Sequence, residues 1–102
     1  MAFTLSRTHS EHLERALDPH TPSADLIGLS LHRDSAVKAA VASRTDCPLA
    51  TLCNLAQEDD ARVLEAVVRN PAAPRRIVEQ LADHKRGSVR EAARARLDAA
   101  RV

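Results

Sequence analysis

The histidines are the first side chains of this chain whose types and spacing could support chemistry. His9 and His12 are spaced i, i+3 on a possible helix, and His20 follows nearby. Two imidazoles at this spacing can share a metal ion. No cysteine or carboxylate joins them at a spacing typical of a metal site, so we expect solvated histidines on a terminal helix and no bound metal.

The two cysteines and an acidic triplet give weak signals for catalysis or cation binding. Cys47 precedes Pro48 at an expected helix start, where the helix dipole could lower the pKa of a thiol, but the sequence places no base beside it. Cys53 is expected to fill a partly buried position on the same helix. The carboxylates of residues 58–60 are adjacent in one loop and cannot all face one cation, so we interpret them as helix caps. We therefore expect no enzyme and no cofactor.

The composition predicts one small helical domain. The chain has 102 residues, is 44% hydrophobic, and contains a single aromatic residue, Phe3. A core built from Ala, Val and Leu suits closely spaced helices, because strands favour aromatic and β-branched residues. No apolar run approaches the roughly 20 residues that span a bilayer, and the first residues lack the pattern of a secretory signal. Two cysteines make no disulfide framework, so we expect a reduced, cytoplasmic protein.

Charge is distributed unevenly along the chain. Residues 1–69 carry seven basic and ten acidic side chains, net −3, whereas residues 70–102 carry eight basic and four acidic, net +4. Arg86, Arg90 and Arg94 could line one stripe that meets phosphates or an acidic protein, or they could belong to a solvated outer face. An overall pI near 7.9 and the near absence of aromatic residues argue against a dedicated nucleic-acid binder.

The prolines mark an internal repeat. Pro22, Pro48 and Pro74 are 26 residues apart, and in two of the three copies a first proline stands three positions earlier. Five further positions keep their chemical class at the same spacing: Leu26, Leu52 and Val78; Leu29, Leu55 and Leu81; Val37, Val63 and Val89; Ala40, Ala66 and Ala92; Val41, Val67 and Ala93. We call each set of positions that are separated by this proline-to-proline spacing a column.

Within each copy, the apolar positions follow a helical period. Spacings of i, i+3 and i, i+4 predict a first helix with proline in its first turn, a short break, and a second helix. The expected start signals are Thr21 as an N-cap of the first copy, Asp34 and Asp60 as N-caps of second helices, Ser88 with Glu91 as a capping box, and Thr8 with Glu11 as a capping box of an N-terminal partial copy.

Stacked copies of this kind predict an all-α solenoid in a single domain, residues 1–102. Residues 1–17 form the N-terminal cap, 18–43, 44–69 and 70–95 the three two-helix repeats, and 96–102 an extension of the last helix. A single copy cannot bury its own apolar stripe, so neighbours must cover it. Tetratricopeptide and ankyrin units are longer, at about 33–34 residues, and HEAT or armadillo units longer still, at about 40–47.

The repeat resembles that of the leucine-rich repeat variant family. The matching pattern is Asn70-Pro71-x-x-Pro74, Val78, Leu81-Ala82 and Val89-Arg90-x-Ala92-Ala93, and the middle copy, CPLATLCNLAQEDDARVLEAVVRNP, is similar. The resemblance covers roughly residues 13–96. It implies a right-handed superhelix of alternating α- and 3₁₀-type helices. The family's N-terminal four-cysteine region, which holds an iron–sulfur cluster, has no counterpart, because residues 1–17 contain no cysteine.

Two columns on one helix predict where a partner would bind. Leu64 and Val68 are apolar where the other copies have Lys38 and Ala42, or Arg90 and Arg94. The pair is either part of a wide core stripe or an exposed docking spot. We expect a non-enzymatic protein-interaction module, with Leu64 and Val68 as an apolar anchor and Arg86, Arg90 and Arg94 as a charged rim.

The alternative function is binding of a nucleic-acid backbone through the basic C-terminal copy. We expect a monomer or weak homodimer that uses no membrane.

Overall fold

The computed structural model describes residues 11–100, and within them every regular element is a helix and no strand occurs. A helix over residues 11–17 comes first. It is followed by α2 (Ser23–Leu29), α3 (Ser35–Ala42), α4 (Leu49–Leu55), α5 (Ala61–Arg69), α6 (Arg75–Leu81) and α7 (Gly87–Ala100). The expected all-α class is confirmed. The short helices are α-helices, so the alternation with 3₁₀-type helices that the family resemblance implies does not occur within residues 11–100. α7 continues to Ala100, past residue 95, where the predicted third copy ends.

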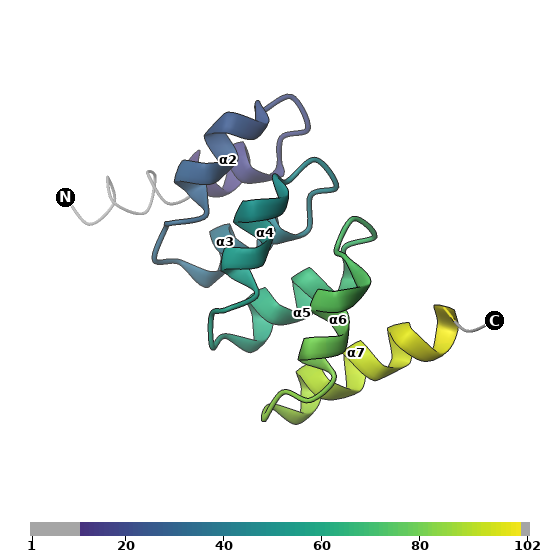
Figure 1. Cartoon of the computed structure of the whole chain (residues 1–102). Helices are drawn as coiled ribbons and strands as arrows, with labels where there is room; N and C mark the ends of the chain where they lie inside the picture. Colours follow the sequence, from purple (N-terminus) through teal and green to yellow (C-terminus); the bar gives the residue numbers. More distant parts are fainter. Residues whose placement is uncertain (1–10, 101–102) are drawn as a thin grey trace.

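The longer helices form a continuous series through the molecule. α3 packs against α5, and α5 packs against α7, while each short helix contacts the longer helix that follows it. The body measures 49 × 26 × 19 Å, with the helix of residues 11–17 at one end and α7 at the other (Figure 1). The functional surfaces must therefore lie along this elongated body or at its two ends.

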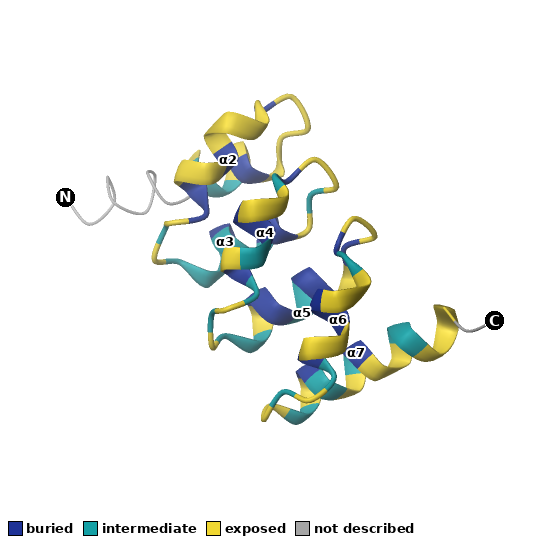
Figure 2. Cartoon of the chain, viewed as in Figure 1, coloured by how far each residue is buried: buried dark blue, intermediate teal, exposed yellow. Residues whose placement is uncertain are grey.

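Most of the predicted columns lie in the core, although Ala66 and Ala92 are only partly buried against it. In Figure 2 buried segments lie where helices face one another, and exposed segments lie on the outer turns. The fully buried side chains include Leu26, Leu52 and Val78, and also Val37, Val63 and Val89, while Leu29, Leu55 and Leu81 are 9%, 1% and 4% exposed. Burying a leucine contributes roughly 1.5–3 kcal/mol, so these columns carry most of the packing energy of the fold.

The second proline of each copy is the N-cap residue and not the first helical residue. Pro22, Pro48 and Pro74 have φ between −61° and −56° and ψ between 140° and 146°, and no side chain caps the helix that follows them. Thr21 is therefore not an N-cap, and that prediction was wrong. Its hydroxyl donates to the carbonyl of Arg15 at 2.6 Å, which joins the first proline loop to the preceding helix.

The second helices follow the predicted caps in two copies of three. The Asp34 carboxylate accepts from the Ala36 amide, and that of Asp60 accepts from the Arg62 and Val63 amides. In the third copy α7 begins at Gly87, so Ser88 already lies inside the helix and cannot be its N-cap. Thr8, half of the other expected capping box, lies outside the described residues.

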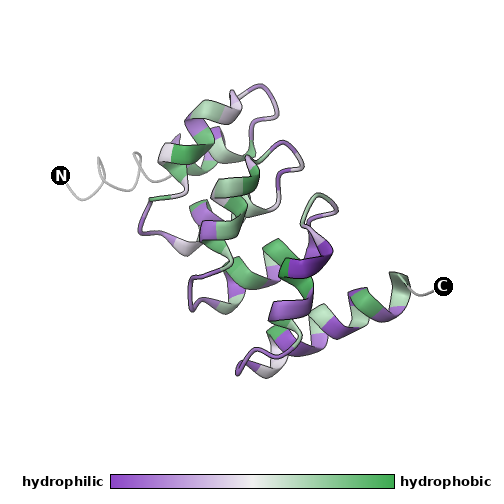
Figure 3. Cartoon of the chain, in the orientation of Figure 1, coloured by the Kyte–Doolittle hydropathy of each residue, from purple (hydrophilic) through white to green (hydrophobic). Residues whose placement is uncertain are grey.

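Hydropathy varies from residue to residue along the helices instead of forming long apolar blocks. In Figure 3 the turns are mostly hydrophilic, whereas each helix carries both hydrophobic and hydrophilic residues. Across residues 11–100, no helix combines the length and apolar character that crossing a membrane requires.

The packing can be tested by truncating two leucines of α4. Leu55 is 1% exposed, so Leu55→Ala should lower the free energy of unfolding by about 2–5 kcal/mol, measured by urea denaturation. The same change at Leu49, which is 57% exposed on the same helix, should cost less than about 1 kcal/mol. Equal losses at the two positions would contradict this arrangement of the core.

Candidate functional site

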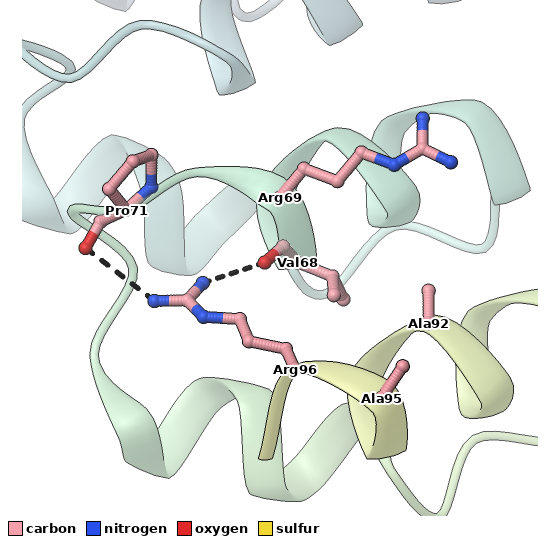
Figure 4. A pocket seen from close by; sticks show the side chains of 6 residues that line it. All are labelled: Val68, Arg69, Pro71, Ala92, Ala95 and Arg96. Carbon is pink, nitrogen blue, oxygen red and sulfur yellow. Dashed lines mark hydrogen bonds between the residues drawn. The ribbon is translucent and has the colours of Figure 1, made fainter. Parts of the chain in front are cut away.

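The expected apolar anchor belongs to the core. Leu64 and Val68 are 0% and 1% exposed, so neither side chain is available to a partner, and the docking hypothesis for this pair was wrong. Val68 lines a hollow together with Ala92 and Ala95 of α7 (Figure 4). Since Leu64 lies one turn before Val68 on the same face of α5, α7 covers this column, and the wide-stripe alternative holds.

The three arginines of the expected rim are held by neighbouring turns. Arg86 donates from Nε to Asp59 (2.8 Å), Arg90 donates to the carbonyl of His84 (3.1 Å), and Arg94 donates to the carbonyl of Ala82 (3.1 Å). Arg90 and Arg94 occupy the columns of Leu64 and Val68, which α7 covers in the preceding copy. In the described chain no helix follows α7, and these long side chains instead fold back over the turn between α6 and α7.

An ion-pair group joins the turn before α5 to the turn before α7. Asp59, in the turn before α5, lies 2.8 Å from Arg86 and 3.2 Å from Lys85, in the turn before α7. Hydrogen bonds from Arg86 and then Lys85 hold the pKa of the Asp59 carboxyl below its usual value. All three side chains are largely exposed, so the group orients the turns more than it stabilises the fold.

Neither cysteine has the surroundings of a nucleophile. Cys47 is buried, and it precedes α4 instead of lying on the same helix as Cys53. Burial, together with the nearby charge of Asp46, raises the pKa of the Cys47 thiol to about 11. The suggestion that a helix dipole lowers this pKa was therefore wrong. Both thiols are free, and Cys53 is half-buried against the core, as expected.

Two histidines from different segments meet between the first helix and the turn before α3. Nε2 of His32 lies 3.0 Å from Nδ1 of His12, and the rings pack edge to face with centroids 4.9 Å apart. The amide of Asp34 donates to Nδ1 of His32 at 3.0 Å. In a neutral His32, Nε2 then carries the proton and donates to His12, so the pair forms a hydrogen bond and offers no free nitrogen lone pair between the rings.

A metal site at the histidines gains no further ligands in the structure. Residues 11–100 contain no group of three or more metal-ligating side chains, and His9 lies outside this range. The role of His32 was not predicted, although its column is visible in the sequence: His32, Glu58 and His84 are separated by the repeat spacing. Nδ1 of His84 accepts from the amide two positions ahead, as Nδ1 of His32 does.

A second column missed from the sequence binds backbone carbonyls across the copies. We call Arg44, Asn70 and Arg96 the carbonyl-binding column. Arg44 donates to the carbonyls of Ala16, Asp18, Pro19 and Thr21; Asn70 donates to those of Ala42 and Arg44; Arg96 donates to those of Val68, Asn70, Pro71 and Ala73. Each member therefore holds the end of a helix and the turn one copy earlier, and Asn70 and Arg96 also bind the carbonyl of the preceding member of the column.

The members of this column differ in charge: Arg44 is paired with a carboxylate, whereas Asn70 is neutral. A bidentate pair with Asp46, at 2.8 and 2.9 Å, raises the pKa of Arg44 and lowers that of Asp46. Asn70 is uncharged and 1% exposed, and its side-chain oxygen accepts from the Ala72 amide at 2.8 Å. The amide thus satisfies a buried turn without the desolvation penalty that a buried ion would carry.

An open hollow of about 640 Å³ lies beside this column at the C-terminal end. It is lined by Val68, Arg69, Pro71, Ala92, Ala95 and Arg96. Figure 4 shows Arg96 extending toward Pro71 and Arg69 extending the opposite way, with the methyl groups of Ala92 and Ala95 directed to the space between. A second hollow, two copies earlier in the chain, has Leu17, Pro19, Ser43 and Arg44 at the equivalent positions.

Comparison with protein-family models, with curated proteins and with solved structures gave no match. Any assignment must therefore come from the residues and their contacts. Within the described chain, the best-defined features are the hydrogen bonds of the carbonyl-binding column and the open hollow beside it.

The role of Asn70 can be tested with two substitutions. Asn70→Ala removes the donors for two carbonyls at a buried turn and should lower the free energy of unfolding by about 2–4 kcal/mol in urea denaturation. Asn70→Asp keeps the shape but replaces donors with a carboxylate, so it should be at least as harmful near neutral pH. If Asn70→Asp retained wild-type stability there, the assigned hydrogen bonds would be wrong.

Proposed function

We propose that the chain is a non-enzymatic protein-binding module, built as a right-handed solenoid of three two-helix repeats like those of the leucine-rich repeat variant family. Two observations support the repeat. The columns Leu26, Leu52 and Val78 and Val37, Val63 and Val89 are buried throughout, and the carbonyl-binding column makes the same kind of contact at each junction. Equivalent residues with equivalent contacts are what stacked copies require.

The exposed aliphatic residues of the first two copies carry the functional proposal. Ile27 on α2 is 51% exposed, Leu49 on α4 is 57% exposed, and Leu31, just after α2, is 81% exposed. In α6, Glu79 and Arg75 occupy the columns of Ile27 and Leu49. The apolar character of this surface is thus confined to the first two short helices, which favours a partner with an apolar side chain or surface of its own.

A non-enzymatic role agrees with the environment of the strongest nucleophile candidate. The Cys47 thiol is buried and its pKa is raised to about 11, so at neutral pH very little of it is the reactive thiolate. The three arginines of the expected rim, Arg86, Arg90 and Arg94, bind a carboxylate and two carbonyls of the chain itself.

The binding surface can be tested with paired variants. Ile27→Ser with Leu49→Ser should leave the free energy of unfolding within about 1 kcal/mol of wild type and abolish retention of a partner in pull-downs from the native cytoplasm. The matched control, Arg75→Ser with Glu79→Ser, changes the same columns on α6 and should keep that partner. If both double variants retained the same proteins, this surface would not be the binding site.

Binding of a nucleic-acid backbone is the second candidate, supported by the net charge of +4 in residues 70–102. We expect no retention on heparin or duplex DNA at about 50 mM salt, because Arg86, Arg90 and Arg94 already bind groups of the chain. Retention that weakens steeply with salt, and is lost in Arg90→Glu with Arg94→Glu, would favour nucleic acid instead.

A further inference from the structure

The two ends of the molecule differ in both charge and shape. All four large aliphatic side chains that are exposed in the described chain, Leu17, Ile27, Leu31 and Leu49, lie in the part with net charge −3. The hollow of Figure 4 lies between α5 and α7, in the region where the net charge changes to positive. One end of the body presents the exposed Leu17, with the exposed carboxylates of Glu14 and Asp18 close to it in the chain, and the other presents a hollow lined by Arg69 and Arg96.

The hollow suits one aliphatic side chain that is accompanied by a carboxylate. Its accessible apolar lining comes from Ala92 and Ala95, whose small side chains leave the space open, whereas Val68 also lines it but is 1% exposed. Arg69 stands at its edge, is exposed, and makes no side-chain hydrogen bond or ion pair within the described part of the chain. Arg96 is occupied by carbonyls, so Arg69 is the group that can neutralise an incoming carboxylate.

The helix of residues 11–17 carries a matching pair. Leu17 is 61% exposed at the end of this helix, and Glu14, three positions earlier, is exposed on the same side of it. Leu17 and Arg69 occupy the same column two copies apart, so this column holds an apolar side chain at one end of the molecule and a cation at the other.

We propose that the chain associates with a second copy of itself head to tail. Leu17 of one copy lies on Ala92 and Ala95 of the next, and Glu14 pairs with Arg69 there. Within one molecule the first helix and α7 lie at opposite ends of a 49 Å body, so the contact forms only between molecules (Figure 1). The two surfaces differ, so the contact is heterologous and leaves a free end for the next copy. This proposal goes beyond the proposed function and does not depend on it.

Sedimentation equilibrium of the full chain tests the association. At about 20 mM salt the weight-average mass should rise with protein concentration into the hundreds of micromolar, and at about 500 mM salt the rise should weaken because the ion pair is screened. A mass that stays at 11.1 kDa at every concentration in low salt would overturn the proposal.

Charge reversal identifies the surfaces. Arg69→Glu and Glu14→Arg should each remove the concentration dependence, whereas an equimolar mixture of the two variants, or one chain carrying both changes, should restore it. Leu17→Ser should weaken association at any salt concentration. Arg76→Glu, an exposed change of the same charge on α6, should leave it unchanged.

Unchanged urea midpoints would show that every variant is folded. Association that survives Arg69→Glu would overturn the proposal. If that association were instead lost in Ile27→Ser with Leu49→Ser, the copies would meet through the surface assigned to a partner. The two experiments therefore distinguish failure of the head-to-tail contact from failure of the partner-binding surface.

Discussion

The structure depends on the burial of apolar faces that no single helix can cover. α2, α4 and α6 have seven residues each, fewer than the roughly 12–15 at which an isolated helix becomes even marginally stable. They exist because Leu26, Leu52 and Val78 are completely or almost completely buried against the longer helices. The helices of this chain are thus consequences of packing between neighbours and not of local propensity.

Close packing of short helices creates a second requirement, because every helix end leaves backbone carbonyls without helical partners. Glycine often ends helices in a left-handed conformation, but the described chain has no residue with positive φ. The carbonyl-binding column supplies donors instead, and one guanidinium or amide serves several carbonyls of the preceding turn. In the described residues no buried side-chain nitrogen or oxygen lacks a hydrogen-bond partner, so the donors of this column are themselves satisfied.

The sequence predicted what depends on periodicity and missed what depends on neighbours. The apolar columns and the caps Asp34 and Asp60 could be read directly, because each follows from spacing along one helix. The burial of Leu64 and Val68 could not, because it depends on α7 covering that face of α5. The roles of Asn70 and Arg96 could not be predicted from local spacing either, since their hydrogen-bond partners lie 23 to 28 residues away in the sequence. A comparison of polar columns, in addition to apolar ones, would have found both.

The last helix shows how the same columns can serve packing in one copy and solvation in another. In α5 two columns hold Leu64 and Val68, which a following helix must cover, and in α7 they hold Arg90 and Arg94. An arginine can lay its methylene groups over apolar surface and place its guanidinium on nearby carbonyls, so it ends the described series of helices without exposing a leucine. The charge of this end thus has a structural cause. Arg69 needs a different account, because no carbonyl or carboxylate of the described chain binds it, and an unpartnered cation beside a small apolar hollow is where external recognition is expected to concentrate.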